Sequence, residues 1–249
     1  MSDVMEPFPI PAPAFNGQSR VVPAGNAFEW LKQGWALFAA NPGMWIALTV
    51  LFIAVMIGLS IVPFLGVLAA NLIAPVLGAG LLLAARKAAD AEMLAVADLF
   101  AGFKQNTNSL ILLGAVYLVA MLVLVVIVFA VGGGGIASAL VSGSPYGIAL
   151  ALGGVLLALL FSLVLAVPLF MAMWFAPALV FFNSMPPIDA LKASFNACLK
   201  NTLAFTVYGL IVVVLLFFAT LPAGLGLLVL VPVIAGSTYV SYRDIFLAN

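Results

Sequence analysis

The sequence predicts an all-α, polytopic membrane protein with six transmembrane helices, arranged as three hairpins that each follow a short amphipathic interfacial helix. Two properties of the 249 residues predict this class: 66% of them are hydrophobic, and only 6% are charged. Soluble chains are about half apolar, whereas apolar runs of about 20 residues are typical of membrane-spanning helices. A third observation, one pattern that occurs three times, predicts a pseudo-threefold repeat.

The repeated pattern is an amphipathic segment that ends at an asparagine and precedes a long apolar run. In the first copy, Asn41 is expected to cap a helix that begins at Pro42. Counted back from Asn41, Asn106 and Asn201, large or apolar residues recur at the same four offsets, which places each set on one helical face. These faces are Phe28, Leu31, Trp35 and Phe38; Met93, Val96, Phe100 and Phe103; and Ile188, Leu191, Phe195 and Cys198.

Each face is expected to lie toward the membrane or the helix bundle, because so short a helix needs an apolar surface to be stable. Polar residues such as Lys32, Asp98 and Lys192 are expected on the opposite, solvated side. The repeat units cover about residues 24–86, 90–183 and 187–246 of a single membrane domain, 23–249. Residues 1–22 are rich in proline and are expected to form a disordered cytoplasmic tail.

The six predicted membrane helices are apolar runs bounded by turn residues. Gly132 to Gly135 and the segment Ser142 to Pro145 indicate a loop between the third and fourth helices. Whether residues 132–152 form a loop, a re-entrant segment or a helix extension stays open. The predicted spans are 42–62, 65–85, 107–131, 148–182, 202–221 and 224–239.

The charged residues all fall on one side of this topology. The eight basic residues lie before the first helix, in the two long connections, or after the last helix, and the three opposite turns carry no charge. By the positive-inside rule, the charged side and both termini are cytoplasmic. The four tryptophans map near the same side, as interfacial anchors do: Trp30, Trp35, Trp45 and Trp174.

Groups that perform chemistry are scarce in this sequence. There is no histidine and one cysteine, Cys198, so zinc sites built from cysteine and histidine and histidine-based general catalysis are excluded. We therefore expect no enzyme, no metal, no cofactor and no catalytic residue, and the lack of a dense basic cluster argues against nucleic acid. Asn71, four residues before Pro75, is the most polar side chain at membrane depth. It either supports the proline kink or lines a polar cavity.

Both ends of the domain resemble a known family. Val22-Pro23-Ala24, Trp30-Leu31, Gly34-Trp35, Leu37-Phe38, Pro42 and Trp45 at the start, and Tyr239 with Ser241-Tyr242-Arg243-Asp244-Ile245-Phe246 at the end, are similar to an uncharacterised family of bacterial six-helix inner-membrane proteins. The resemblance spans nearly the whole chain and implies an inner-membrane location. It implies no activity.

Two functions are compatible with this sequence. The first is a non-catalytic accessory or scaffold protein that presents amphipathic helices to a membrane-protein partner or to a second copy of itself, within membrane lipid. The alternative is a transporter or facilitator of an apolar or lipid-like solute. The candidate interface residues are Trp30, Trp35, Phe100, Phe195 and Arg243.

Overall fold

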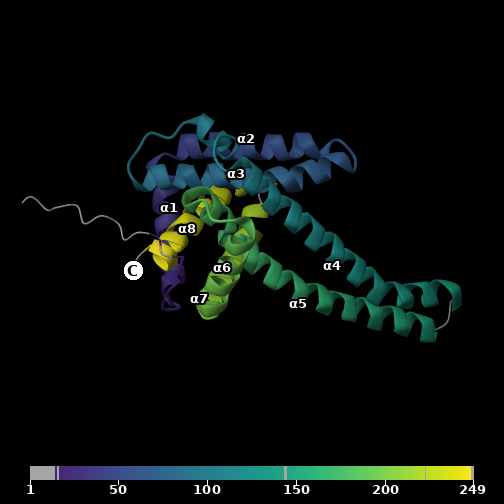
Figure 1. The fold of residues 1–249 in the computed structure, drawn as a ribbon. Coiled ribbons are helices and arrows are strands. Elements are labelled where there is room, and N and C mark those ends of the chain that lie inside the picture. The colour runs from purple at the N-terminus through teal and green to yellow at the C-terminus, as the bar shows by residue number, and fades with distance from the viewer. Residues whose placement is uncertain (1–14, 16, 143–144, 222, 248–249) are drawn as a thin grey trace, which may run out of the picture.

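The structure is a computed structural model that describes residues 15, 17–142, 145–221 and 223–247. Every regular element in these ranges is a helix, so the predicted all-α class is confirmed. Along the chain the helices follow one another in three consecutive groups (Figure 1). The groups are α1 (Asn26–Ala40), α2 (Pro42–Ser60) and α3 (Leu65–Ala89); η1 (Val96–Phe103), α4 (Thr107–Ser142) and α5 (Pro145–Asn183); and α6 (Pro187–Lys200), α7 (Thr202–Thr220) and α8 (Leu227–Tyr242), which continues into a π-helical turn, η2 (Arg243–Leu247).

Five of these helices are long and apolar enough to cross a membrane: α2, α3, α4, α5 and α7. The expected sixth span is present as α8, but this helix has only 16 residues, about 24 Å at 1.5 Å per residue. Ten of its residues are buried. The described structure therefore contains five candidate spans, and α8 lies among them as a buried central helix.

The first residues of α2, α3, α4 and α7 are those that the sequence predicts. Asn41 caps α2 as expected, because its Oδ1 accepts a hydrogen bond of 3.3 Å from the Met44 backbone N–H. Asn106 and Asn201 hold the corresponding turns differently. The Asn106 side chain donates to the Val180 carbonyl at 2.8 Å, which ties the start of α4 to the end of α5.

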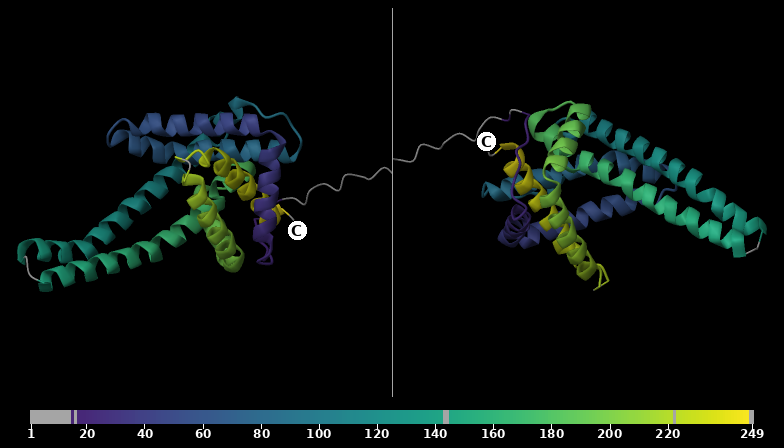
Figure 2. Two further views of the ribbon diagram at one scale, coloured as in Figure 1. Left: turned by 180° about the vertical axis from the view of Figure 1, so that it is seen from behind. Right: turned by 90° about the horizontal axis from the view of Figure 1, so that it is seen from below.

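The glycine-rich segment is helical, so the predicted loop at residues 132–135 is wrong. Helix α4 continues through Gly132 to Ser142, and α5 begins at Pro145. Within a membrane a regular helix satisfies its own backbone hydrogen bonds, and this outweighs glycine's cost of about 1 kcal/mol per residue. A Cβ at Gly132 would lie 3.0 Å from Cβ of Ala158, so glycine lets α4 and α5 pack closely. The two form a long hairpin that projects from the bundle (Figures 1 and 2).

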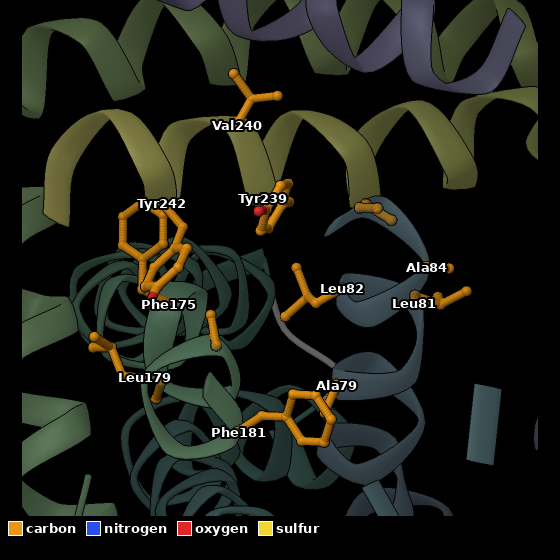
Figure 3. Close-up of a cluster of buried hydrophobic side chains, with 14 of the residues drawn as sticks. Ala79, Leu81, Leu82, Ala84, Phe175, Leu179, Phe181, Tyr239, Val240 and Tyr242 are labelled. Carbon is orange, nitrogen blue, oxygen red and sulfur yellow. The ribbon is translucent and has the colours of Figure 1, made fainter. Parts of the chain in front are cut away.

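The core lies where α3, α5 and α8 meet. Figure 3 shows Leu82 of α3, Phe175 and Leu179 of α5, and Tyr239 and Tyr242 of α8 gathered in this region. All five side chains are at most 6% exposed. Because α8 supplies the centre of this cluster, it links the first hairpin to the second.

Helix α1 packs across α8 and buries only part of its predicted apolar face there. A Cβ at Gly34 would lie 2.6 Å from the Val233 carbonyl oxygen, so the two backbones approach closely at this glycine. The contact turns Trp30 inward, at 1% exposed, and leaves Phe28 and Trp35 61% and 54% exposed. Leu31 and Phe38 of the predicted face are buried as expected.

The second amphipathic segment is the one that departs most from expectation. It forms an eight-residue 3₁₀-helix, η1, in place of a longer α-helix. Leu99 and Gly102 are buried against the bundle, whereas Met93 is 90% exposed. Asp98, expected on the solvated side, is buried, and its carboxylate accepts hydrogen bonds from Lys87 Nζ at 2.6 Å and from the Ala95 backbone N–H at 2.8 Å. The Ala95 N–H at the start of η1 has the Asp98 carboxylate as its acceptor, which accounts for the burial of Asp98 although helical periodicity places it on the solvated side.

A serine hydroxyl group of α6 interrupts one backbone hydrogen bond of α5. Ser194 Oγ accepts from the Phe175 N–H at 2.9 Å and donates to the Met171 carbonyl at 2.7 Å, the two groups that would bond each other in a regular helix. Such an insertion bends a helix. Cys198 lies one turn farther along α6, with Sγ 3.5 Å from the same carbonyl.

The Cys198 thiol is expected to be inert. It is 2% exposed, and burial raises its pKa to about 12, so the reactive thiolate is scarce at neutral pH. We predict that native protein in detergent reacts with maleimide far more slowly at Cys198 than at a cysteine placed at the exposed Leu199, and that Cys198→Ser remains folded. Rapid labelling of Cys198 would contradict this burial.

Candidate functional site

A polar cluster joins the two ends of the described chain. Asp244, in η2, forms an ion pair with Arg20. Its Oδ2 also accepts hydrogen bonds of 2.8 Å from Asn26 Nδ2 and from Trp30 Nε1. The carboxylate therefore fixes the N-terminal segment and α1 against the end of α8.

The segment before α1 is held at a second point. Asn201, between α6 and α7, accepts a hydrogen bond from the Val22 N–H at 2.8 Å and donates one to the Arg20 carbonyl at 2.9 Å. Phe15 also lies against Phe246, with ring centroids 6.2 Å apart. Residues 20–22 of the expected disordered tail are therefore ordered, and residues 1–14 and 16 lie outside the described ranges.

We predict that Asp244→Ala lowers the free energy of unfolding by about 2–4 kcal/mol, because it leaves the buried Trp30 N–H without its acceptor and removes the ion pair with Arg20, which keeps its bond to the Asp244 backbone carbonyl. Partial burial alone would raise the pKa of Asp244. The hydrogen bonds from Trp30, Asn26 and Arg20, together with the charge of Arg20, outweigh the effect of burial, and the pKa of Asp244 is lowered. Because the pKa is lowered in the folded state, the stabilisation by ionised Asp244 is complete above the unfolded-state pKa of about 3.9. This stabilisation is lost as the pH falls through the folded-state pKa.

The measurement is denaturant-induced unfolding at pH 7 and at stepwise lower pH, in one detergent. Glu29→Ala is the control, since Glu29 makes only a loose pair with Lys32 at 3.8 Å between exposed side chains. Equal stability of Asp244→Ala and Glu29→Ala at pH 7 would contradict the prediction.

A cavity of about 330 Å³ opens beside this cluster. Its walls include Trp30 and Asp244, and its charged or polar rim is formed by Glu29, Gln33 and Arg243. Arg243 is exposed. The cavity therefore opens at the surface, has an acidic and a basic residue at its rim, and lies against the hydrogen-bonded Asp244 cluster.

An apolar cleft of about 310 Å³ lies between α2, α3, α5 and α8. Its lining includes Phe52, Gly78, Phe170, Trp174 and Ile234. Trp174 Nε1 is buried, and among the described residues it has no hydrogen-bond partner. The indole is held from the side by Phe205 and Tyr208, whose ring centroids lie 6.2 and 5.6 Å from its own.

Asn71 lines a neighbouring cavity of about 220 Å³ together with Tyr117 and Pro75. Its Nδ2 donates to the Val67 carbonyl at 2.8 Å, one turn back on α3. The side chain thus bonds to its own helix one turn before the Asn71 carbonyl, the group that Pro75 leaves without an N–H partner, and it lines a cavity whose other walls are mostly apolar.

The structure does not gather the predicted interface residues into one site. Trp30 is part of the core, so it is not available to a partner, whereas Trp35 is exposed. Phe100 and Phe195 are half-buried on η1 and α6. Arg243 lies beside the Asp244 cluster, which the sequence analysis missed because Asp244 and Arg20 are 224 positions apart.

Comparison with known proteins identifies the family. No family model and no solved structure matches the chain. The chain is 32% identical over 228 residues to the "Probable inner membrane protein BTH_II0599" of Burkholderia thailandensis. The matched region covers 88% of this chain and 82% of that protein. The five apolar helices agree with that location. The predicted resemblance is confirmed, and the chain belongs to this family of bacterial inner-membrane proteins.

Proposed function

We propose that this protein is a non-catalytic scaffold of the inner membrane that holds a second membrane protein against the outer face of α1. The proposal includes six membrane-embedded helices in three pseudo-threefold hairpins, with the charged ends and both termini in the cytoplasm. The observation that carries it is the exposure of two large aromatic side chains, Phe28 and Trp35, on a helix that is otherwise fixed.

The rigidity of α1 supports this role. One face of the helix is anchored by Gly34 against α8 and by Trp30 against Asp244. The opposite face therefore stays in place without a partner, and a preformed aromatic surface loses little conformational freedom on binding. Tryptophan, here Trp35, is among the residues that most often dominate the energy of protein interfaces.

In vivo photocrosslinking tests the proposal. A photoreactive amino acid at Phe28 or Trp35 is expected to give a discrete protein adduct, and one at Gln33, which is exposed on a different side of the same helix, is the matched control. Equal adducts from the three positions, or lipid adducts alone, would show that α1 only anchors the protein at the membrane surface.

Topology is tested separately. Reporters fused at residue 1, near residues 95 and 190, and at residue 249 are expected to be cytoplasmic, because the charged residues flank these positions. A periplasmic signal from any one of them would overturn the proposed orientation and the count of spans.

The apolar cleft favours the alternative function, a facilitator of an apolar or lipid-like solute. The two functions differ in one measurable property. A scaffold leaves the movement of a fluorescent fatty acid across reconstituted vesicles at the rate of protein-free vesicles, whereas a facilitator increases that rate.

A further inference from the structure

We propose that α5 contains a hinge at residues 171–175, latched by Ser194 of α6, about which the α4–α5 hairpin takes two angles to the bundle. In the latched angle, which the structure shows, the Ser194 hydroxyl stands between the Phe175 N–H and the Met171 carbonyl. In the second angle these two backbone groups bond each other directly. The hinge is independent of the proposed partner surface on α1.

The backbone of α5 is interrupted at several points within a short stretch. Pro168 and Pro177 lie inside the helix, and a proline leaves the carbonyl four residues before it without an N–H partner. The Ser194 insertion lies between these two prolines. Bends of more than about 20° in helices occur at prolines and at such insertions. Residues 168–177 are therefore the part of α5 that bends most easily.

The hinge lies at the boundary between the fixed and the projecting parts of α5. Directly after it, residues 175, 176 and 178–181 are buried in the bundle. Directly before it, residues 161–170 are all exposed or half-buried, in the hairpin that extends away from the other helices (Figures 1 and 2). A change of angle at this boundary would therefore move the hairpin and leave the core in place.

Helix α4 leaves the bundle at the same level. A Cβ at Gly114 would lie 2.7 Å from the Asn71 carbonyl oxygen, so α4 is held closely against α3 at this glycine. No residue from 115 to 131 is buried. Tyr117 of α4 and Met173 of α5 line the same cavity of about 220 Å³, which places the two helices level with each other. Gly114 thus gives α4 a pivot beside the hinge of α5, and a long helix beyond a pivot can curve.

Both angles satisfy the hydrogen bonds of the groups involved. In the latched angle Ser194 Oγ accepts from the Phe175 N–H at 2.9 Å and donates to the Met171 carbonyl at 2.7 Å. In the second angle the two backbone groups form the usual helical bond, and the released hydroxyl bonds to the Ala190 carbonyl one turn back on α6. Each group keeps a partner in both arrangements, so the two angles are close in free energy.

The side chains near the hinge have room to shift. Phe170 and Met173 border both the cleft of about 310 Å³ and the cavity of about 220 Å³. Most of the lining of these two spaces is apolar, so a rearrangement of α5 toward them exchanges one apolar contact for another. Packing at the hinge therefore permits the second angle.

Double electron–electron resonance measures the angle in the full-length protein in nanodiscs. Spin labels are attached at Leu152→Cys on the hairpin and at Leu203→Cys on α7, where the native side chains are exposed, while the buried Cys198 is left in place. Leu152 lies 19 residues before Met171, about 28 Å along the helix. A change of about 20° at the hinge moves this label by about 10 Å.

Ser194→Ala removes the latch. It is expected to shift the ratio of the two distances about tenfold toward the second angle, the value of about one hydrogen bond. Ser241→Ala is the matched control, because Ser241 is also buried and its hydroxyl bonds to the Thr238 carbonyl of its own helix at 2.9 Å. This control should give the wild-type distances.

Wild type is measured in thin and thick bilayers, made of dimyristoyl or dierucoyl phosphatidylcholine. Membrane helices adapt to bilayer thickness by tilting, so the same two distances should occur in different proportions. Two results would overturn the proposal. Equal distance distributions for Ser194→Ala and Ser241→Ala would mean that the hydroxyl does not set the angle. A single wild-type distance, unchanged between the two bilayers, would mean that the hairpin is rigid, and this result does not depend on the folding of any serine variant.

Discussion

Gly80→Ala is expected to lower the free energy of unfolding by about 3 kcal/mol or more. A Cβ at Gly80 would lie 2.1 Å from the Leu99 carbonyl oxygen and 2.7 Å from that of Asp98. Both atoms belong to the backbone of η1, so no side-chain rotation can relieve the contact, and overpacking of this kind exceeds the usual 1–3 kcal/mol. Helix α3 and η1 would have to separate.

Gly78→Ala is the control, two residues away on the same helix. Its new Cβ meets no atom within 4 Å, and alanine is favoured over glycine in a helix by about 1 kcal/mol. We expect this variant to be as stable as wild type or more stable. Unfolding of both variants by sodium dodecyl sulfate in mixed micelles gives the comparison, and equal midpoints would mean that η1 does not pack on α3 as described.

Asp98→Ala is expected to cost about 3–5 kcal/mol, because it breaks a buried ion pair and leaves Lys87 without its partner. The Lys87 side chain is 26% exposed and that of Asp98 only 8%. The same substitution removes the acceptor of the Ala95 N–H at the start of η1. The sequence had placed Asp98 on a solvated face, where its removal would leave folding intact, so this variant separates the two interpretations.

The matched control is Asp189→Ala in α6, at an exposed aspartate in the first turn of the helix. It removes the same charge from the corresponding end of the third unit, where only a helix-dipole contribution of about 0.3–1 kcal/mol is expected. Unfolding in mixed micelles at pH 7 is the measurement. If Asp98→Ala were no more destabilising than Asp189→Ala, the burial of Asp98 would be incorrect.

The membrane helices were predictable because their determinants are local. An apolar run must satisfy its backbone within the segment, so the starts at Pro42, Leu65, Thr107 and Thr202 agree with the structure. The same rule explains the error at Gly132, where turn propensity was given more weight than the requirement of the membrane. The predicted sixth helix, 224–239, has the same length of 16 residues as α8 (Leu227–Tyr242). The burial of α8 inside the bundle was not predicted, since burial inside a bundle and exposure to lipid select the same apolar residues.

The candidate sites were less predictable because their determinants are distant in sequence. Nothing near Asp244 indicates that Arg20 and Trp30 converge on it. Likewise, Trp174 is an ordinary interfacial tryptophan in sequence, and its unpartnered N–H follows only from the packing of α5 against α7 and α8. The Gly34 contact explains why only Leu31 and Phe38 of the predicted apolar face of α1 are buried in the bundle: the close approach of the two backbones, and not the number of apolar residues, sets the orientation of the helix.

The projecting α4–α5 hairpin has a consequence for the area that the protein occupies in the bilayer. The apolar part of α4, Thr107–Gly134, has 28 residues and is therefore about 42 Å long, whereas the hydrocarbon layer is about 30 Å thick. The excess length of about 12 Å has to be accommodated by tilt of the hairpin, by local thickening of the bilayer or by protrusion beyond the hydrocarbon layer. Because the hairpin also projects from the bundle, its apolar surface would contact lipid far from the remaining helices (Figures 1 and 2).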